Sequence, residues 1–316
     1  MAQRVLAVLG AVVIVLVAVV VRSAIDDDDD GSDPSGDGDG GGGELVLACD
    51  TDLEAYCRAV TGTSGLFVEE SATTSLGVID GALNEVDAWV TSDAWFEVTQ
   101  ARADVIGAAE VLASSPVVAA VDPDRATAVS GLCGDQAIWR CLGDRAGEPW
   151  ASLGGQPTWG PLDTGLPDAD RSTGLSILAS VASAYFGDQD FAANEFDDAF
   201  TSWLDRLTAP APRGDPDPDP ANTLVVRRGT YTAAGTVEAR LTAITRPVDR
   251  LVVEPGASAR VVLVDLPGGD DVADVTRQLR ELLTTAGWAP GSGEPAPTLK
   301  PGVMAALHTL WTEVTR

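Results

Sequence analysis

Hydroxyl side chains recur at the places where a short apolar run changes into a helical pattern. Thr51 follows residues 44–49, Thr73 and Thr74 follow residues 66–69, and Thr91 and Ser92 follow residues 87–90. Ser and Thr at a helix start accept hydrogen bonds from free backbone N–H groups. The same hydroxyls and N–H groups can hold a small polar ligand. Capping explains each residue singly, and the recurrence makes the set a candidate binding site.

The sequence R-S-T-G at positions 171–174 places an arginine and two hydroxyls at another helix entrance. An apolar series with a period near 3.6 follows and predicts a helix that ends at Gly187. The S-S-P sequence at 114–116 predicts a break inside an apolar strand, either an ordinary break or a contact with ligand. The candidate ligand-binding residues are Thr51, Thr73, Thr74, Thr91, Ser92, Ser114, Ser115, Arg171, Ser172 and Thr173.

The elements that would position these residues alternate along the chain. Short apolar strands followed by helical segments predict βαβ units and a mainly parallel sheet, whose carboxyl edge collects the turns that bear hydroxyls. Residues 209–222 form a Pro/Asp-rich loop, and a strand is expected over residues 223–227. Two strands joined by a Pro-Gly turn are expected within 250–267, and helices within 270–288 and 302–314.

The charge is strongly one-sided, with 48 acidic and 20 basic residues and a formal net charge of −28. Nucleic-acid binding depends on Lys and Arg neutralising phosphates, so this balance argues against a nucleic-acid partner. It also argues against attachment to anionic lipid through the folded surface and slows the approach of free anions. The alternative is that the acids simply form a solvated exterior.

The N-terminal region is expected to lie outside the fold. Residues 5–21 are apolar apart from Gly10 and are flanked by Arg4 and Arg22, so residues 1–24 are expected to be a transmembrane anchor or a cleaved signal peptide. Residues 25–43 contain eight Asp and no base, and they are expected to form a flexible, disordered linker. The closing Glu of an EF-hand calcium loop is missing there.

The four cysteines form two local pairs, each with a separation of eight residues. Four cysteines permit three connectivities. An exported chain favours oxidation, and we expect the disulfides Cys49–Cys57 and Cys133–Cys141. Zinc is the weaker interpretation, because C-x-x-C spacing is missing and the single histidine, His308, is far away in the sequence.

The sequence carries little that points to catalysis. No G-x-S-x-G or H-E-x-x-H motif occurs, and a single histidine removes most nucleophile–base arrangements. Asp168 and Asp170 could act as an acid and a base, but acids in a Pro/Gly loop are more often turn formers. We therefore expect no enzyme activity, no cofactor and no bound metal.

Residues 44–316 resemble bacterial extracellular solute-binding proteins with the type 2 periplasmic-binding fold. They are similar to the actinobacterial branch in which such a domain precedes a von Willebrand A domain. The resemblance rests on DAWVTSDAWFE (87–97), LASSPVVAAV (112–121), residues 159–175, and residues 250–267 followed by 277–288. The D-x-S-x-S metal motif of von Willebrand A domains is missing, so metal-dependent adhesion is not implied.

The resemblance implies an α/β, two-lobed clamp in which each lobe is a mainly parallel sheet flanked by helices. Lobe 1 would comprise residues 44–112 and 248–316, and lobe 2 residues 113–247. The resemblance implies that a small polar ligand binds between them for ABC-type uptake, with an ABC permease as the partner. The same fold could instead serve as a tethered extracellular module that binds an envelope protein. Either way, the chain is expected at the cell membrane with an extracellular domain, or secreted if residues 1–24 are cleaved.

Overall fold

A computed structural model describes residues 45–315, except 62–64, 84, 103–106, 210–216, 268–271 and 292–298. The expected anchor or signal peptide (1–24), the expected linker (25–43) and residues 210–216 of the expected 209–222 loop lie outside the described residues. Within the described part, no helix is both long enough and apolar enough to cross a membrane.

The first part of the chain folds as the βαβ pattern predicts. Three short strands lie parallel in the order β2-β1-β3, with register pairs such as Cys49 with Val68 and Cys49 with Val90. The central strands β1 and β3 are fully buried, which explains their continuous apolar sequences. The elements are β1 (Leu47–Asp50), α2 (Glu54–Thr61), β2 (Leu66–Glu69), α3 (Ser71–Ile79), β3 (Ala88–Ser92) and α4 (Asp93–Gln100).

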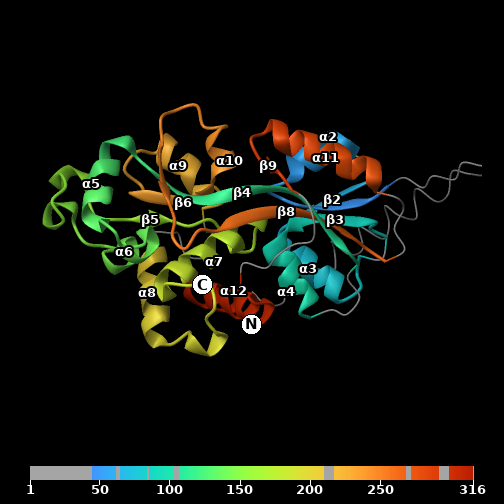
Figure 1. Cartoon of the computed structure of the whole chain (residues 1–316), viewed down its shortest axis with the longest axis horizontal. Helices are drawn as coiled ribbons and strands as arrows, with labels where there is room; N and C mark the ends of the chain where they lie inside the picture. The colour runs from blue at the N-terminus through green and yellow to red at the C-terminus, as the bar shows by residue number, and fades with distance from the viewer. Residues whose placement is uncertain are drawn as a thin grey trace, which may run out of the picture. The chain divides into compact units, whose positions relative to one another are not determined.

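A long strand, β4 (Ala109–Val121), joins two halves of the sheet. Its residues 109–116 pair antiparallel with β8 (Ser258–Asp265), and residues 117–121 pair antiparallel with β6 (Ala233–Val237). Figure 1 shows β4 and β8 running side by side through the middle of this assembly. We call β2, β1, β3, β8, β9 (Ala289–Pro290) and residues 109–116 the first half, and residues 117–121, β6, β7 (Asp249–Val252) and β5 (Thr164–Gly165) the second half.

The expected break at S-S-P is wrong, because β4 continues through these residues. Ser114, Ser115 and Pro116 remain in register with Arg260, Ala259 and Ser258 of β8. Proline has no N–H to donate, and Pro116 lies where the partner of β4 changes from β8 to β6 and β7. Its position at this change of partner is what makes proline tolerable inside a long strand.

The second half differs from a mainly parallel sheet. Strands β6 and β7 both pair antiparallel with β4, and the parallel pairing is confined to the two-residue strand β5 against β6. The strand expected over 223–227 is also wrong, because residues 223–226 belong to helix α9 (Pro220–Val226) and Arg227 is its C-cap. Asp219 accepts a hydrogen bond from the Asn222 N–H at 3.0 Å, and Pro220 occupies the first turn, so local capping overrides the β-branched composition.

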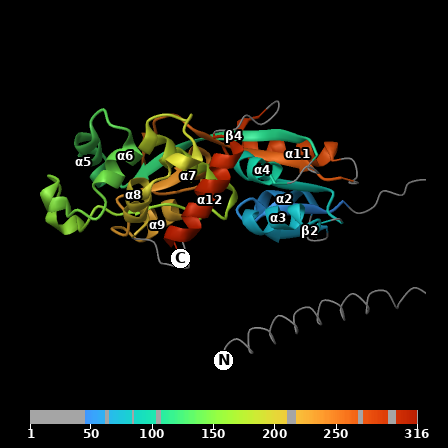
Figure 2. The same ribbon diagram turned by 90° about the horizontal axis from the view of Figure 1, so that it is seen from below.

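Helix α7 (Ser172–Phe186) begins and ends where the sequence predicts, and packs on strands of both halves. Gly187 follows it with a φ of 83°, a left-handed conformation that favours glycine. Helix α12 (Pro301–Thr315) packs against α7, α8 and α4, and Figure 2 shows it alongside α7 and α8. The remaining helices are α5 (Pro123–Cys133), α6 (Ile138–Asp144), α8 (Asp198–Thr208), α10 (Glu238–Leu241), α11 (Ala273–Thr285), and the 3-10 turns η1 (Trp150–Ser152), η2 (Pro157–Trp159) and η3 (Ala193–Glu195).

Both predicted disulfides are present and confirm the local pairing. Cys49 of β1 is bonded to Cys57 of α2, and Cys133 of α5 is bonded to Cys141 of α6. Each disulfide thus joins two successive elements across a short connection. The first of them holds the turn between β1 and α2, which forms part of the site described next.

Candidate functional site

A cavity of about 880 Å³ lies between segments attached to the two halves of the sheet. On one side are the turn after β1 and the end of α11, and on the other are α9 and α10 with the residues after it. A cavity of this size is typical of sites for small organic ligands. Its lining residues are Asp52, Leu53, Tyr56, Arg171, Pro218, Asp219, Asn222, Val225, Val226, Ala239, Arg240, Thr242, Ala243, Ile244, Thr245, Arg246, Ala286 and Trp288.

Asp52 connects the two sides of this cavity. Its Oδ2 accepts hydrogen bonds from Arg240 Nη2 at 2.6 Å, from Thr173 Oγ1 at 3.1 Å and from the Thr173 N–H at 3.3 Å. Only 5% of the Asp52 side chain is exposed, compared with 25% for Arg240. The carboxylate therefore caps the start of α7 and pairs with α10, both of which follow strands of the second half.

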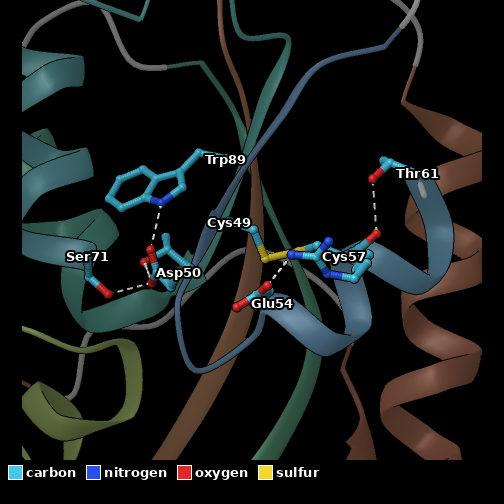
Figure 3. The surroundings of a disulfide bond; sticks show 9 residues. Cys49, Asp50, Glu54, Cys57, Thr61, Ser71 and Trp89 are labelled. Carbon is cyan, nitrogen blue, oxygen red and sulfur yellow. Dashed lines mark hydrogen bonds and ion pairs between the residues drawn. A yellow bond between two sulfur atoms is a disulfide. The ribbon is translucent and has the colours of Figure 1, made fainter. Parts of the chain in front are cut away.

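Asp50, two residues earlier, is completely buried and bonds within the first half. Its carboxyl accepts hydrogen bonds from Ser71 Oγ at 2.6 Å, Thr91 Oγ1 at 2.5 Å and Trp89 Nε1 at 3.0 Å. Figure 3 shows it between Ser71 and Trp89, beside the Cys49–Cys57 disulfide. Burial, with a smaller contribution from the charge of Asp52, raises the pKa of Asp50 to about 8, against the opposing effect of the three hydrogen bonds.

Four of the candidate residues make hydrogen bonds that hold the walls of the site in place. Thr91 bonds Asp50 and Thr173 bonds Asp52. Ser92 accepts from the Trp95 N–H at 3.4 Å as the N-cap of α4. Ser115 of β4 accepts from the Ala239 N–H at 2.9 Å, which fixes the start of α10 beside the cavity. The capping explanation therefore accounts for Ser92, and the other three act between segments distant in sequence.

The remaining candidates are more scattered. Thr51 and Ser114 are half-buried, Thr73 is exposed on α3, and Thr74 bonds the Glu70 carbonyl one turn earlier. The Ser172 hydroxyl is buried without a hydrogen-bond partner among the described residues. Among the ten candidates, Arg171 is the one that lines the cavity, and its guanidinium lies 3.9 Å from Glu70. Their binding roles stay predictions.

The R-S-T-G sequence has a close-packing requirement as well. A Cβ on Gly174 would collide with the carbonyl group of Asp168, so the loop before α7 can lie against the first turn of the helix because residue 174 is glycine. The acids of this loop point to α12: Asp170 bonds His308 at 2.6 Å, and Asp168 accepts from Trp311 Nε1 at 3.3 Å. Burial raises the pKa of Asp168 above its ordinary value.

Sequence reasoning missed the charged residues at the centre of the site. Asp50 and Asp52 flank Thr51 in the sequence C-D-T-D, and neither belongs to the predicted set of hydroxyl-bearing residues. Arg240 and Arg246 were missed as well. The sequence did carry one signal for these arginines. Basic residues are few in this chain, 20 against 48 acids, so a base that follows a predicted strand is a candidate for ligand binding.

No protein-family model matches the sequence, and no curated protein matches it. Solved structures do match. The chain has the fold of periplasmic solute-binding proteins. An ABC transporter structure from Clostridium perfringens is 10% identical, with a TM-score of 0.53, and the match covers 86% of this chain and 100% of that one.

Two further structures have the same fold. Apo FutA2 from Synechocystis is 13% identical with a TM-score of 0.51, and the match covers 86% of this chain and 98% of that one. A periplasmic thiamin binding protein is 10% identical with a TM-score of 0.51, and the match covers 90% of this chain and 100% of that one. At these identities the likeness is one of fold.

Proposed function

We propose that the chain is an extracytoplasmic solute-binding protein that captures a small polar ligand between two lobes, without a chemical step, and delivers it to an ABC permease. The lobes would be residues 44–112 with 248–316, and residues 113–247. The fold shared with periplasmic binding proteins supports this proposal. In that arrangement, residues 1–24 would anchor the chain at the membrane, or be cleaved to release it. We also propose that the chain is related to the solute-binding domains that precede von Willebrand A domains in actinobacteria.

The observation that carries the proposal is the cavity and the polar contacts across it. Residues on both sides line about 880 Å³, and Asp52 joins the two sides through Thr173 and Arg240. A ligand in the cavity can compete for these contacts, because Asp52 and Arg240 both line it. Ligand binding would then change the separation of the lobes by a hinge motion at β4 and β8.

Thermal-shift screening of the full-length chain against oxyanions, sugars, amino acids, organic acids and metal ions tests the proposal. A ligand that binds the folded state is expected to raise the melting temperature, and the rise grows with the logarithm of the ligand concentration once this exceeds the Kd. Ala243→Trp places a bulky ring in the cavity and is expected to abolish the shift. Ala151→Trp, at another exposed alanine outside the cavity, is the matched control.

Two results would count against the proposal. A hit that survives Ala243→Trp would place binding outside the cavity. The absence of any hit, together with capture of one envelope protein by the folded chain, would favour the alternative of a tethered interaction module.

A further inference from the structure

The cavity carries more positive charge than the chain around it. Three arginines line it, Arg171, Arg240 and Arg246, against the two acids Asp52 and Asp219. The whole chain has 48 acids and 20 bases, so an excess of bases at one cavity reverses the general balance. This local reversal is the kind of charge arrangement that selects an oppositely charged ligand at close range.

Two of these arginines are weakly neutralised. Arg240 is paired with Asp52 at 2.6 Å, whereas Arg171 has Glu70 at 3.9 Å, the outer limit of an ion pair. Arg246 is exposed and donates to the Val225 carbonyl at 3.1 Å, and no carboxylate of the described residues lies within ion-pair distance of it. The carboxylate of Asp219 is engaged at the start of α9. Guanidinium groups in this state can bind an anion with two parallel hydrogen bonds.

The rest of the wall is largely apolar. Leu53, Val225 and Trp288 are buried in this wall. Its solvent-accessible apolar surface belongs to the half-buried Tyr56 and Ile244 and to the exposed Val226. An inorganic oxyanion would leave this surface in contact with water, whereas a ligand with an apolar body would cover it. The apolar wall and the weakly neutralised guanidinium groups therefore match the two ends of one ligand.

We infer that the cavity binds an organic anion: a carboxylate, or a similar acid, attached to an apolar body. The acid group lies against Arg171 and Arg246, and the apolar body lies against Tyr56, Val226 and Ile244. This inference rests on the proposed solute-binding function and names the class of its ligand. The acidic exterior slows the approach of such a ligand, and the arginines act after it has arrived.

Calorimetry of the full-length chain with 6-phenylhexanoate, 6-phenylhexanamide and 6-phenylhexylamine tests the inference, because the three probes share one apolar body. The carboxylate is expected to bind at least 10-fold more tightly than the amide, and the amine is expected to bind more weakly still. Equal or tighter binding of the amide or the amine overturns the inference, and so does the failure of all three to bind.

Substitutions separate the acid group from the apolar body. Arg246→Gln is expected to weaken carboxylate binding about 10-fold, the loss of one charged hydrogen-bonded pair, and to leave amide binding unchanged. Arg246→Lys should recover part of the loss. Arg145→Gln, which removes an exposed arginine paired with Glu148, is the matched control. Unchanged carboxylate affinity in Arg246→Gln overturns the inference. If the thermal-shift library finds a neutral or cationic ligand instead, solute binding stands and the ligand class is wrong.

Discussion

Asp50 and Asp52 are the same residue type two positions apart, yet their hydrogen-bond partners lie in different halves of the structure. Asp50 is fully buried, and its three partners all belong to the first half of the sheet or its helices. Asp52 lines the cavity, and its partners Thr173 and Arg240 belong to segments that follow strands of the second half. One acid stabilises a part of the fold, and the other depends on how two parts meet.

The difference follows from the geometry of a strand end. Asp50 is the last residue of β1, where its side chain still lies among neighbouring strands and finds Trp89 and Thr91 of β3. Asp52 lies past the strand, in the turn before α2, where side chains project from the sheet edge toward other segments. In open α/β sheets, ligands bind beyond the carboxyl ends of the strands. Asp50 is thus placed to stabilise the first half of the sheet, and Asp52 is placed to contact the segments across the cavity.

The largest expected effect comes from removing the buried acid. Asp50→Ala leaves two hydroxyls and an indole N–H without their acceptor, and we expect the free energy of unfolding to fall by about 3–5 kcal/mol. Asp50→Asn keeps an acceptor for Trp89 and should cost about 1 kcal/mol. Urea unfolding of both variants measures the difference. Equal costs of the two substitutions would contradict this expectation, because they would show that the acceptor retained by Asn contributes nothing.

The second-largest expected effect comes from a substitution at Gly174, beside the contact between Thr173 and Asp52. Gly174→Ala forces the loop at Asp168 away from the first turn of α7, where Thr173 meets Asp52, and we expect a loss of about 2–3 kcal/mol. Gly131 in α5 has open space around its missing Cβ, so Gly131→Ala should be neutral or stabilising by about 0.5–1 kcal/mol. Thermal and urea unfolding compare the two. A similar result at both glycines would contradict the close-packing argument.

The first half of the sheet could be predicted from the sequence because its signals are local. Apolar runs followed by capping residues specify β1, β3 and their helices, and cysteines eight residues apart find each other without knowledge of the fold. The second half is specified by long-range pairing. Strand β4 changes partner at Pro116, and α9 forms from β-branched residues, because tertiary contacts and a cap outweigh propensity.

The residues of the candidate site also fall into those that local sequence predicts and those that only long-range contacts reveal. Arg171 and Thr173 could be found, since a base and hydroxyls at a helix entrance are visible in the sequence. The partner of Thr173 is 121 residues away and that of Asp52 in α10 is 188 residues away, so no sequence spacing connects them. Charged residues at a site between distant segments become visible only when the fold brings the segments together.

The buried acid also predicts that stability depends on pH. Burial raises the pKa of Asp50 to about 8, while an unfolded aspartate titrates near 4. Between these values the folded protein holds one more proton than the unfolded chain, so raising the pH favours unfolding by up to about 1.4 kcal/mol per pH unit. Urea unfolding from pH 5 to pH 8 measures the slope. Asp50→Asn should flatten it by this amount, and an unchanged slope in that variant would exclude Asp50 as its source.

The smallest expected effect tests the cavity acid directly. A double-mutant cycle with Asp52→Asn and Arg240→Gln is expected to give a coupling free energy of about 1 kcal/mol, because the carboxylate is buried but the arginine is partly solvated. The matched pair is Glu54 and Arg58 on α2, an exposed contact between successive turns, which should give about 0.3–0.5 kcal/mol. Urea unfolding of the wild type, the four single mutants and the two double mutants supplies both cycles. A coupling between Asp52 and Arg240 no larger than that of the surface pair would mean that the two sides of the cavity meet without holding each other. In that case a ligand could replace the partners of Asp52 at little cost in free energy. If the coupling is about 1 kcal/mol as expected, a ligand must supply that free energy to separate Asp52 from Arg240.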